Sequence, residues 1–281
     1  MDISAKQVMQ LRQATGLGMM DCKKALIEAE GDFEAAQEIL RKKLGKKAES
    51  KVGREAKEGR SVALITDDKK SGTLVIVNCE SEPVKETDMF KDFVQKVAQL
   101  AYESGATTTD ELLAAAWPGD EGETVEDARK IISGTLGENM QISLRRLAVD
   151  GDGIVGSYVH HDGKIASMVA LAGDGDLTDT AKELCMHITF AKPAVKSRDD
   201  IPADEVEKEL AFLREQAVED PAMKGKPEQA VEGIIQGRLT KNFFGDRVLL
   251  EQAWYRDNKS TVTKELESAG AQLVDFALFG V

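Results

Sequence analysis

The residues able to carry out acid–base, nucleophilic or metal chemistry are few in this sequence, and they do not cluster. It contains three histidines, His160, His161 and His187, and none belongs to an H-E-x-x-H or Cys/His pattern with metal-ligand spacing. No G-x-S-x-G motif is present, and no Ser or Cys stands beside a His in an arrangement typical of a nucleophile. We therefore expect no catalytic residue, no metal site and no cofactor, and we expect that the protein is not an enzyme.

The loops that resemble ligand-binding motifs are incomplete. The Gly16-Leu17-Gly18 turn lacks the Lys-Ser/Thr pair of a phosphate loop and the strand that precedes a dinucleotide site. The acidic glycine repeats at 150–153 and 173–176 lack the later Glu of a calcium loop, so we interpret them as turns at strand ends. The odd number of cysteines, with no C-x-x-C pair, predicts buried thiols rather than a disulfide framework at Cys22, Cys79 and Cys185.

Composition limits the partners that this acidic chain can have. Its 281 residues are 42% hydrophobic and 31% charged, with a formal charge of −13, which fits a globular protein of about two domains. Because nucleic-acid binders usually carry a basic surface, we expect no nucleic-acid partner. No apolar run approaches the roughly 18 residues that span a bilayer, and residues 1–10 lack a signal-peptide pattern. We therefore expect no membrane contact and a cytoplasmic location.

Three short helices are predicted in residues 1–45, and we expect them to form an N-terminal bundle like a ubiquitin-associated domain. Ser4 and Asp32 are suited to cap the first and third helices, and the glycines of the 16–18 turn separate the first from the second. Residues 46–60 are rich in charge and almost devoid of apolar side chains, which predicts a charged linker. An RNA-binding tail is the alternative, but the segment lacks the interleaved aromatic residues that stack on bases.

The remaining chain predicts a duplicated α+β core. Each half, 61–150 and 151–281, begins with two β-rich runs that flank a polar turn and continues with an amphipathic helix. We expect antiparallel sheets with helices packed against them. Within the second half, residues 203–245 contain two amphipathic helices joined by a short turn with Pro and Gly. A narrow apolar stripe with charge on the other faces is typical of a projecting antiparallel helical hairpin.

Several motifs resemble one protein family along nearly the whole chain. The stretch TGLGMMDCKKAL, which begins at Thr15, is highly specific for the opening domain of elongation factor Ts. Further similar segments follow in the family's order: LVIVNCES (74–81), LGENMQISLRR (136–146), GSYVHHDGKIASMVAL (156–171), MHITFAKP (186–193) and DNKSTVTKEL (257–266). The resemblance is strongest at 8–41 and weakest at 103–130 and 205–250.

This resemblance implies a function in translation elongation. Members of the family bind the GTPase elongation factor Tu in its GDP form and promote release of GDP, so that GTP can bind. The resemblance allows either a one-to-one complex or a dimer of heterodimers. The positions that match the family imply a set of partner-binding residues, which consists of Val8, Leu11, Arg12, Gly16, Met19, Met20, Ser81, Glu82, Pro83, Val84, Gly137, Glu138, Asn139 and His160.

The resemblance also implies distinct roles within this set. We expect apolar docking from Leu11 and the two methionines at 19 and 20. We expect a carboxylate near the magnesium ligands of the partner from Glu82, and support of the same face from His160 and the turn at 137–139. The alternative for each methionine is that its side chain simply belongs to the core of the bundle.

The main departure from the family pattern lies at Pro83, where members usually have Phe. A Pro offers less apolar area for contact, fixes φ and has no N–H. One alternative function is therefore a Ts-like protein that binds elongation factor Tu but has reduced or lost exchange activity because of Glu82-Pro83. Another is a chaperone-like protein whose three-helix bundle binds peptides.

Overall fold

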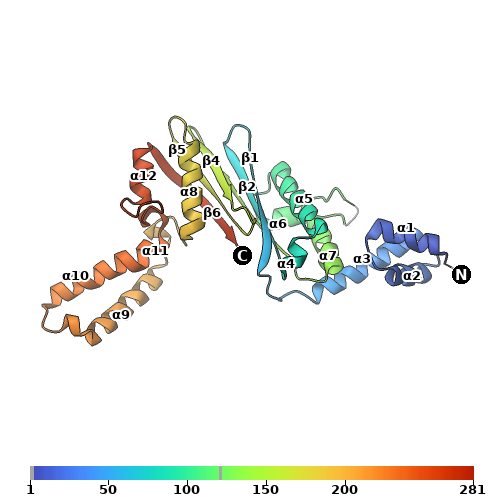
Figure 1. Cartoon of the computed structure of the whole chain (residues 1–281), viewed down its shortest axis with the longest axis horizontal. Helices are drawn as coiled ribbons and strands as arrows, with labels where there is room; N and C mark the ends of the chain where they lie inside the picture. The colour runs from blue at the N-terminus through green and yellow to red at the C-terminus, as the bar shows by residue number, and fades with distance from the viewer. Residues whose placement is uncertain (1–2, 120–121) are drawn as a thin grey trace.

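The computed structural model describes residues 3–119 and 122–281, which form an elongated molecule (Figure 1). The N-terminal helices form a bundle at one end, coloured blue. Antiparallel sheets with helices on their outer sides form the middle, and an orange helical hairpin projects from the other end. The expected α+β class, with an N-terminal helical bundle and antiparallel sheets, is confirmed.

The bundle consists of α1 (Ala5–Thr15), α2 (Met19–Glu28) and α3 (Phe33–Glu49). The Ser4 hydroxyl accepts from the Gln7 amide while the Gln7 side chain accepts from the Ser4 amide, a reciprocal cap that begins α1. Asp32 caps α3 by accepting from the amide of Ala35 at 2.9 Å. The apolar faces meet in a small interior made of Val8, Leu11, Cys22, Ala25, Leu26, Ala36 and Leu40.

The third helix is longer than the sequence predicts, so the expected linker at 46–60 is only partly a linker. Helix α3 continues to Glu49, and strand β1 (Glu58–Ile65) begins before residue 60. The reason is burial: Leu44 and Ala48 on α3 are 7% and 3% exposed. They lie where α3 packs against α7 (Val125–Leu136). The expectation of a charged linker overlooked Ala48, because it follows two lysines and is followed by further charged residues.

The first half of the core is a sheet in the order β1–β2–β3, with β2 at Ser71–Cys79 and β3 at Gln141–Ala148. Its strands are antiparallel, with Ile65 opposite Gly72 and Asn78 opposite Gln141. Helices α4 (Glu82–Lys85), α5 (Asp88–Ser104), α6 (Thr109–Ala114) and α7 follow β2. Helix α5 is the amphipathic helix predicted after the first hairpin, and its buried face consists of Phe90, Phe93, Val94, Val97, Ala98 and Ala101.

The second half repeats this plan, as the sequence predicts. Its sheet has the order β4–β5–β6, with β4 at Gly153–Val159, β5 at Ile165–Gly173 and β6 at Ala271–Gly280. Helices α8 (Thr178–Ala191) and α12 (Val262–Ser268) pack on its outer face. Figure 1 shows the resulting layers in the order helix, sheet, sheet, helix.

The inner faces of the two sheets share one apolar interior. Leu74, Leu147 and Val149 of the first half pack against residues of the second half, namely Val155, Ala166, Met168, Ala170 and Ala277. Backbone hydrogen bonds also cross between the halves: the Ser61 amide donates to Gly163 at 2.8 Å, and the Val155 amide donates to Lys69 at 2.7 Å. The two halves therefore form one body.

Helices α9 (Ala203–Glu219) and α10 (Glu228–Arg238) form the projecting helical arm, and an apolar seam lies between them. The two helices run antiparallel, and a π-helical segment (Leu239–Phe244) and the short α11 (Gly245–Arg247) lead back to the core. The seam is flanked by ion pairs such as Arg214–Glu232 at 2.9 Å. Among the described residues, no helix combines the length and apolarity that a membrane crossing requires.

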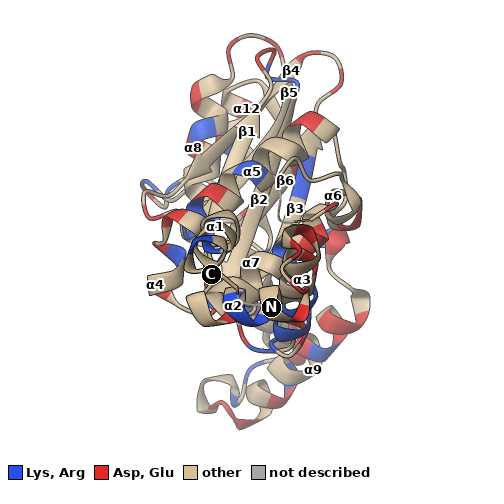
Figure 2. Cartoon of the chain, turned by 90° about the vertical axis from the view of Figure 1, so that its right-hand side faces the viewer, with Lys and Arg blue, Asp and Glu red and all other residues tan. Residues whose placement is uncertain are grey.

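Charged residues are unevenly distributed over the molecule. Figure 2, which looks from the bundle end, shows acidic residues in the loops beside β4 and β5 and a mixture of basic and acidic residues around the bundle. The described residues contain no group of His, Cys, Asp and Glu side chains that could hold a metal ion.

Candidate partner-binding site

The candidate site is centred on α4, a single helical turn directly after β2. Pro83 lies in its first turn, where a backbone N–H has no helical partner and a fixed φ near −65° is already correct. Glu82 and Pro83 are exposed, whereas Val84 is partly buried against the apolar interior between the first sheet and α5. The turn therefore presents a carboxylate and a pyrrolidine ring to the surroundings.

The carboxylate of Glu138, directly after α7, accepts hydrogen bonds from the residues just before this turn. We call this arrangement the brace. Glu138 Oε2 accepts from the amides of Glu80 at 2.9 Å and Ser81 at 3.1 Å, and Glu138 Oε1 accepts from the Ser81 hydroxyl. Gly137 makes this approach possible because its φ of 81° ends α7 in the left-handed conformation. The structure thus brings Ser81 and Glu138 together.

Asn139 completes the brace from the other direction. Its amide donates to Glu80 Oε1 at 2.6 Å, and its side-chain nitrogen donates to the carbonyl of Arg54 at 2.7 Å. Asn139 is 3% exposed, so its side chain supports the site from behind and does not lie on its surface. Glu80 is a residue of this site that the sequence analysis missed, because no local motif indicates that its carboxylate accepts from a residue 59 positions away.

The three cysteine thiols are buried. Burial, and then the negative charge of Glu138, raise the pKa of Cys79 to about 12. Burial likewise raises the pKa of Cys185 to about 12. Cys22 is buried in the bundle. All three thiols are free, so the prediction of buried cysteines without a disulfide is confirmed.

His160 lies in the β4–β5 hairpin, which reaches α4 through Lys164. His160 Nδ1 and Asp162 Oδ1 form a hydrogen bond of 3.0 Å, which lowers the pKa of Asp162. Lys164, in the same hairpin, has its Nζ 3.8 Å from Glu82 Oε1. His187, by contrast, is fully buried far from this hairpin in the chain, stacks on Trp254 and bonds Gln252 at 2.9 Å.

The bundle offers a separate apolar surface. Met19 and Met20 are 43% and 66% exposed, so neither is core of the bundle. Arg12 and Gly16 are exposed as well. Val8 and Leu11 are 4% and 0% exposed, because their spacing on α1 points them into the bundle interior. Their contact with a partner stays a prediction.

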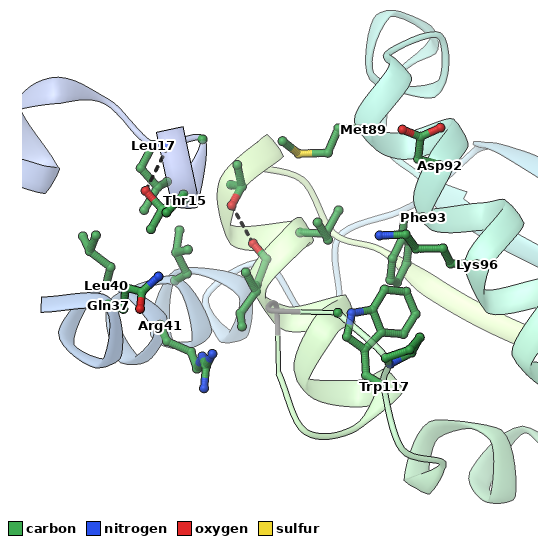
Figure 3. Close-up of a pocket in the computed structure, with 18 residues that line it drawn as sticks. Thr15, Leu17, Gln37, Leu40, Arg41, Met89, Asp92, Phe93, Lys96 and Trp117 are labelled. Atoms are coloured by element: carbon green, nitrogen blue, oxygen red, sulfur yellow. Dashed lines mark hydrogen bonds between the residues drawn. The ribbon is translucent and has the colours of Figure 1, made fainter. Parts of the chain in front are cut away.

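A cavity of about 500 Å³ lies between the bundle and the core (Figure 3). Thr15, Leu17 and Leu40 line it from the bundle side, and Phe93, Lys96 and Trp117 line it from the core side. Gly16 lies on its rim, where an added Cβ would be 3.7 Å from the Met89 methyl group. The turn between α1 and α2 therefore faces the start of α5, three residues beyond the end of α4.

These features define a class of protein: a two-sheet α+β molecule whose candidate site is an exposed, braced turn with apolar residues on a flanking bundle, an arrangement suited to contact with another protein. Comparison with known proteins makes the class specific. The family model described as Elongation factor TS matches residues 80–281. The chain belongs to the elongation factor Ts family and is a translation elongation factor.

Individual relatives agree along nearly the whole chain. Elongation factor Ts of Clostridium botulinum (strain Eklund 17B / Type B) is 41% identical over 269 residues, covering 94% of this chain and 86% of the relative. The Halorhodospira halophila protein of the same name is 41% identical over 281 residues, covering 100% and 92%. That of Prosthecochloris aestuarii is 40% identical over 268 residues, covering 94% and 91%.

Proposed function

We propose that this protein binds elongation factor Tu in its GDP form and accelerates release of GDP, so that GTP can bind. The observation that carries the proposal is the exposed α4 turn with its internal brace. Glu82 and Pro83 face outward, while Glu138 holds the preceding backbone with hydrogen bonds from two amides and a hydroxyl. A turn held in this way keeps its shape when it presses against a partner.

The proposed contact has two parts. Met19 and Met20, with Arg12 and Gly16 beside them, dock the bundle on the nucleotide-binding domain of the partner. Ser81–Val84 approach the partner's magnesium site, and the Glu82 carboxylate disturbs the ligands there. His160 and the 137–139 turn support the same face.

Release of nucleotide follows only if the factor binds the nucleotide-free partner more tightly than the GDP form. A ligand with equal affinity for both states shifts nothing, however tightly it binds. The docking contact through the bundle contributes affinity for both states. The α4 contact supplies the difference between them, because its carboxylate competes with the groups that hold the magnesium ion and GDP.

The direct test is release of a fluorescent GDP analogue from the cognate elongation factor Tu, followed by stopped flow with increasing concentrations of this protein. Acceleration by orders of magnitude supports the proposal. Absence of acceleration while a complex forms in size-exclusion chromatography would contradict it. That result would favour the second candidate, a Ts-like protein that binds elongation factor Tu without exchange, and the mass of the complex separates one-to-one from two-to-two assembly.

Variants of α4 test whether this turn affects the rate of GDP release more than it affects binding. Glu82→Ala and Pro83→Ala should lower the maximal release rate more than they raise the concentration needed for half-maximal release, because they remove contacts that distinguish the two partner states. Pro83→Phe should raise the maximal rate, since the ring adds apolar area at an exposed position that needs no backbone N–H. Glu103→Ala, an exposed carboxylate at the far end of α5, is the matched control.

A further inference from the structure

A buried lysine lies behind the exposed turn. Lys85, the last residue of α4, is 2% exposed, and its Nζ lies 3.2 Å from Glu58 Oε2 of β1 and 3.3 Å from Glu82 Oε1. Glu86 Oε1 is at 3.9 Å. A buried ammonium without carboxylates nearby is strongly unfavourable. Lys85 therefore ties α4 to the edge of the first sheet.

A second lysine reaches the same carboxylates from the other half of the core. Lys164 Nζ, in the β4–β5 hairpin, lies 2.9 Å from Glu58 Oε1 and 3.8 Å from Glu82 Oε1. Glu58, Lys85, Glu82 and Lys164 thus form a closed ring of alternating charge, which we call the charge ring. The members come from β1, α4 and the hairpin, so the ring joins three elements that are distant in the sequence.

Glu58 is the hub of the charge ring. Its Oε2 atom is buried and has no partner with hydrogen-bond geometry, so its negative charge is compensated there by the Lys85 ion pair. The hydrogen bond from Lys164 is the largest cause that lowers the pKa of Glu58, which keeps this carboxyl ionised at neutral pH. Both lysines therefore have a charged partner on the sheet.

The exposed turn needs such support. Four residues form too short a helix to be stable alone. The Glu138 brace holds the backbone before α4, and the charge ring holds its last residue and the side chain of its first. Glu82 is 66% exposed, yet two ammonium groups lie within 4 Å of its Oε1. Its carboxylate is thus oriented while remaining open to a partner.

We propose that Lys85 and Lys164 are positioning residues that hold the Glu82 carboxylate, and with it α4, in the orientation offered to a partner. The kinetic consequence of this role rests on the proposed exchange function, whereas the holding of α4 does not. Because Lys164 belongs to the second half of the core, the orientation of α4 depends on both halves.

Hydrogen–deuterium exchange of the free full-length protein tests the holding of α4. Lys164→Met keeps an unbranched side chain one atom shorter and removes its charge at a position that is 31% exposed. Amide exchange in residues 80–86 should become faster, on the order of tenfold, and Lys164→Arg should restore the protection. Lys130→Met is the matched control, because Lys130 is 35% exposed and pairs with Glu126 at 3.5 Å on α7. Equal protection of 80–86 in the wild type and Lys164→Met would overturn the proposal.

Release of the GDP analogue tests the functional consequence. Lys164→Met should lower the maximal release rate by on the order of fivefold to tenfold, with the half-saturating concentration changed by less than about twofold. Lys164→Arg should recover most of the rate, and Lys130→Met should match the wild type. A loss confined to the half-saturating concentration, or the same loss in Lys130→Met, would contradict a positioning role.

Lys85, the buried member of the charge ring, is tested by changing it together with its partner Glu58. Lys85→Met alone would leave the buried Oε2 atom of Glu58 without its ion pair, so Glu58→Gln/Lys85→Met removes both charges together. This pair should reproduce the faster amide exchange at 80–86. If the wild-type protein does not accelerate GDP release, the proposed function fails, while the amide-exchange results still decide whether the lysines hold α4.

Discussion

At the scale of single residues, the site depends on carboxylates that serve the protein itself. Glu138 satisfies two backbone amides and one hydroxyl next to the exposed turn. Hydrogen bonds to an ionised acceptor are stronger than neutral ones, and a buried amide left without a partner is costly. A residue implied by resemblance to contact a partner thus has an internal role that the resemblance did not reveal.

Replacing Glu138 by Ala should lower the free energy of unfolding by about 2–4 kcal/mol, because three donors lose their acceptor at once. Glu138→Gln should lose less, since its amide oxygen can still accept from the two backbone groups. Urea denaturation measures both, with Glu215→Ala, an exposed carboxylate of the arm, as the control. A loss in Glu138→Ala no larger than in the control would show that solvent satisfies these donors.

At the scale of elements, the contact between α3 and α7 attaches the bundle to the core. Gly134 on α7 allows this contact, because a Cβ there would lie 2.4 Å from the carbonyl oxygen of Leu44. Leu44 and Ala48 bury their side chains at the same contact. The turn at 137–139 follows directly on α7, so the element that holds the bundle also carries the brace of the exposed turn.

Gly134→Ala should therefore destabilise the protein by about 1–3 kcal/mol, because the two helices must move apart. Gly45→Ala on α3 is the matched control: nothing lies within 4 Å of its added Cβ, and the change should stabilise by up to about 1 kcal/mol through helix propensity. Chemical denaturation gives both values, and limited proteolysis at 50–57 reports release of α3. Stabilisation by Gly134→Ala would refute the close helix contact.

At the scale of the whole molecule, the two halves of the core cannot be separated without exposing their shared interior. Met168 on β5 is fully buried there, and an added Cβ on Gly72 of β2 would lie 2.8 Å from its sulfur. Side chains from both sheets fill this layer. We therefore expect the two similar halves to unfold as one cooperative core.

Met168→Ala should lower the stability of both halves together, by about 2–5 kcal/mol, because it leaves a cavity between the sheets. Thermal unfolding followed by calorimetry should show one core transition that shifts as a unit. Met9→Ala, at a side chain that is 52% exposed, should have little effect. Two separate core transitions in Met168→Ala would mean that the halves fold independently.

Local patterns predicted most of the elements, because they are visible within a few residues. The caps at Ser4 and Asp32, the amphipathic helix α5 and the two hairpins follow from side-chain type and spacing alone. The prediction failed where the partner element is distant. Ala48 looked like part of a charged linker, because the helix that α3 packs against lies about 90 residues further along the chain.

The candidate site shows the same difference between what local patterns predict and what contacts between distant residues set. The family, the α+β class and the segments that form the site can be recognised in the sequence, since motif order and hydrophobic period are properties of the chain. Which site residues face outward depends on the folded structure. It buried Leu11, exposed both Met19 and Met20, and turned Glu138 toward Ser81. It also closed the charge ring across β1, α4 and the β4–β5 hairpin. Burial and ion pairing depend on distances between residues far apart in sequence, and folding alone sets those distances.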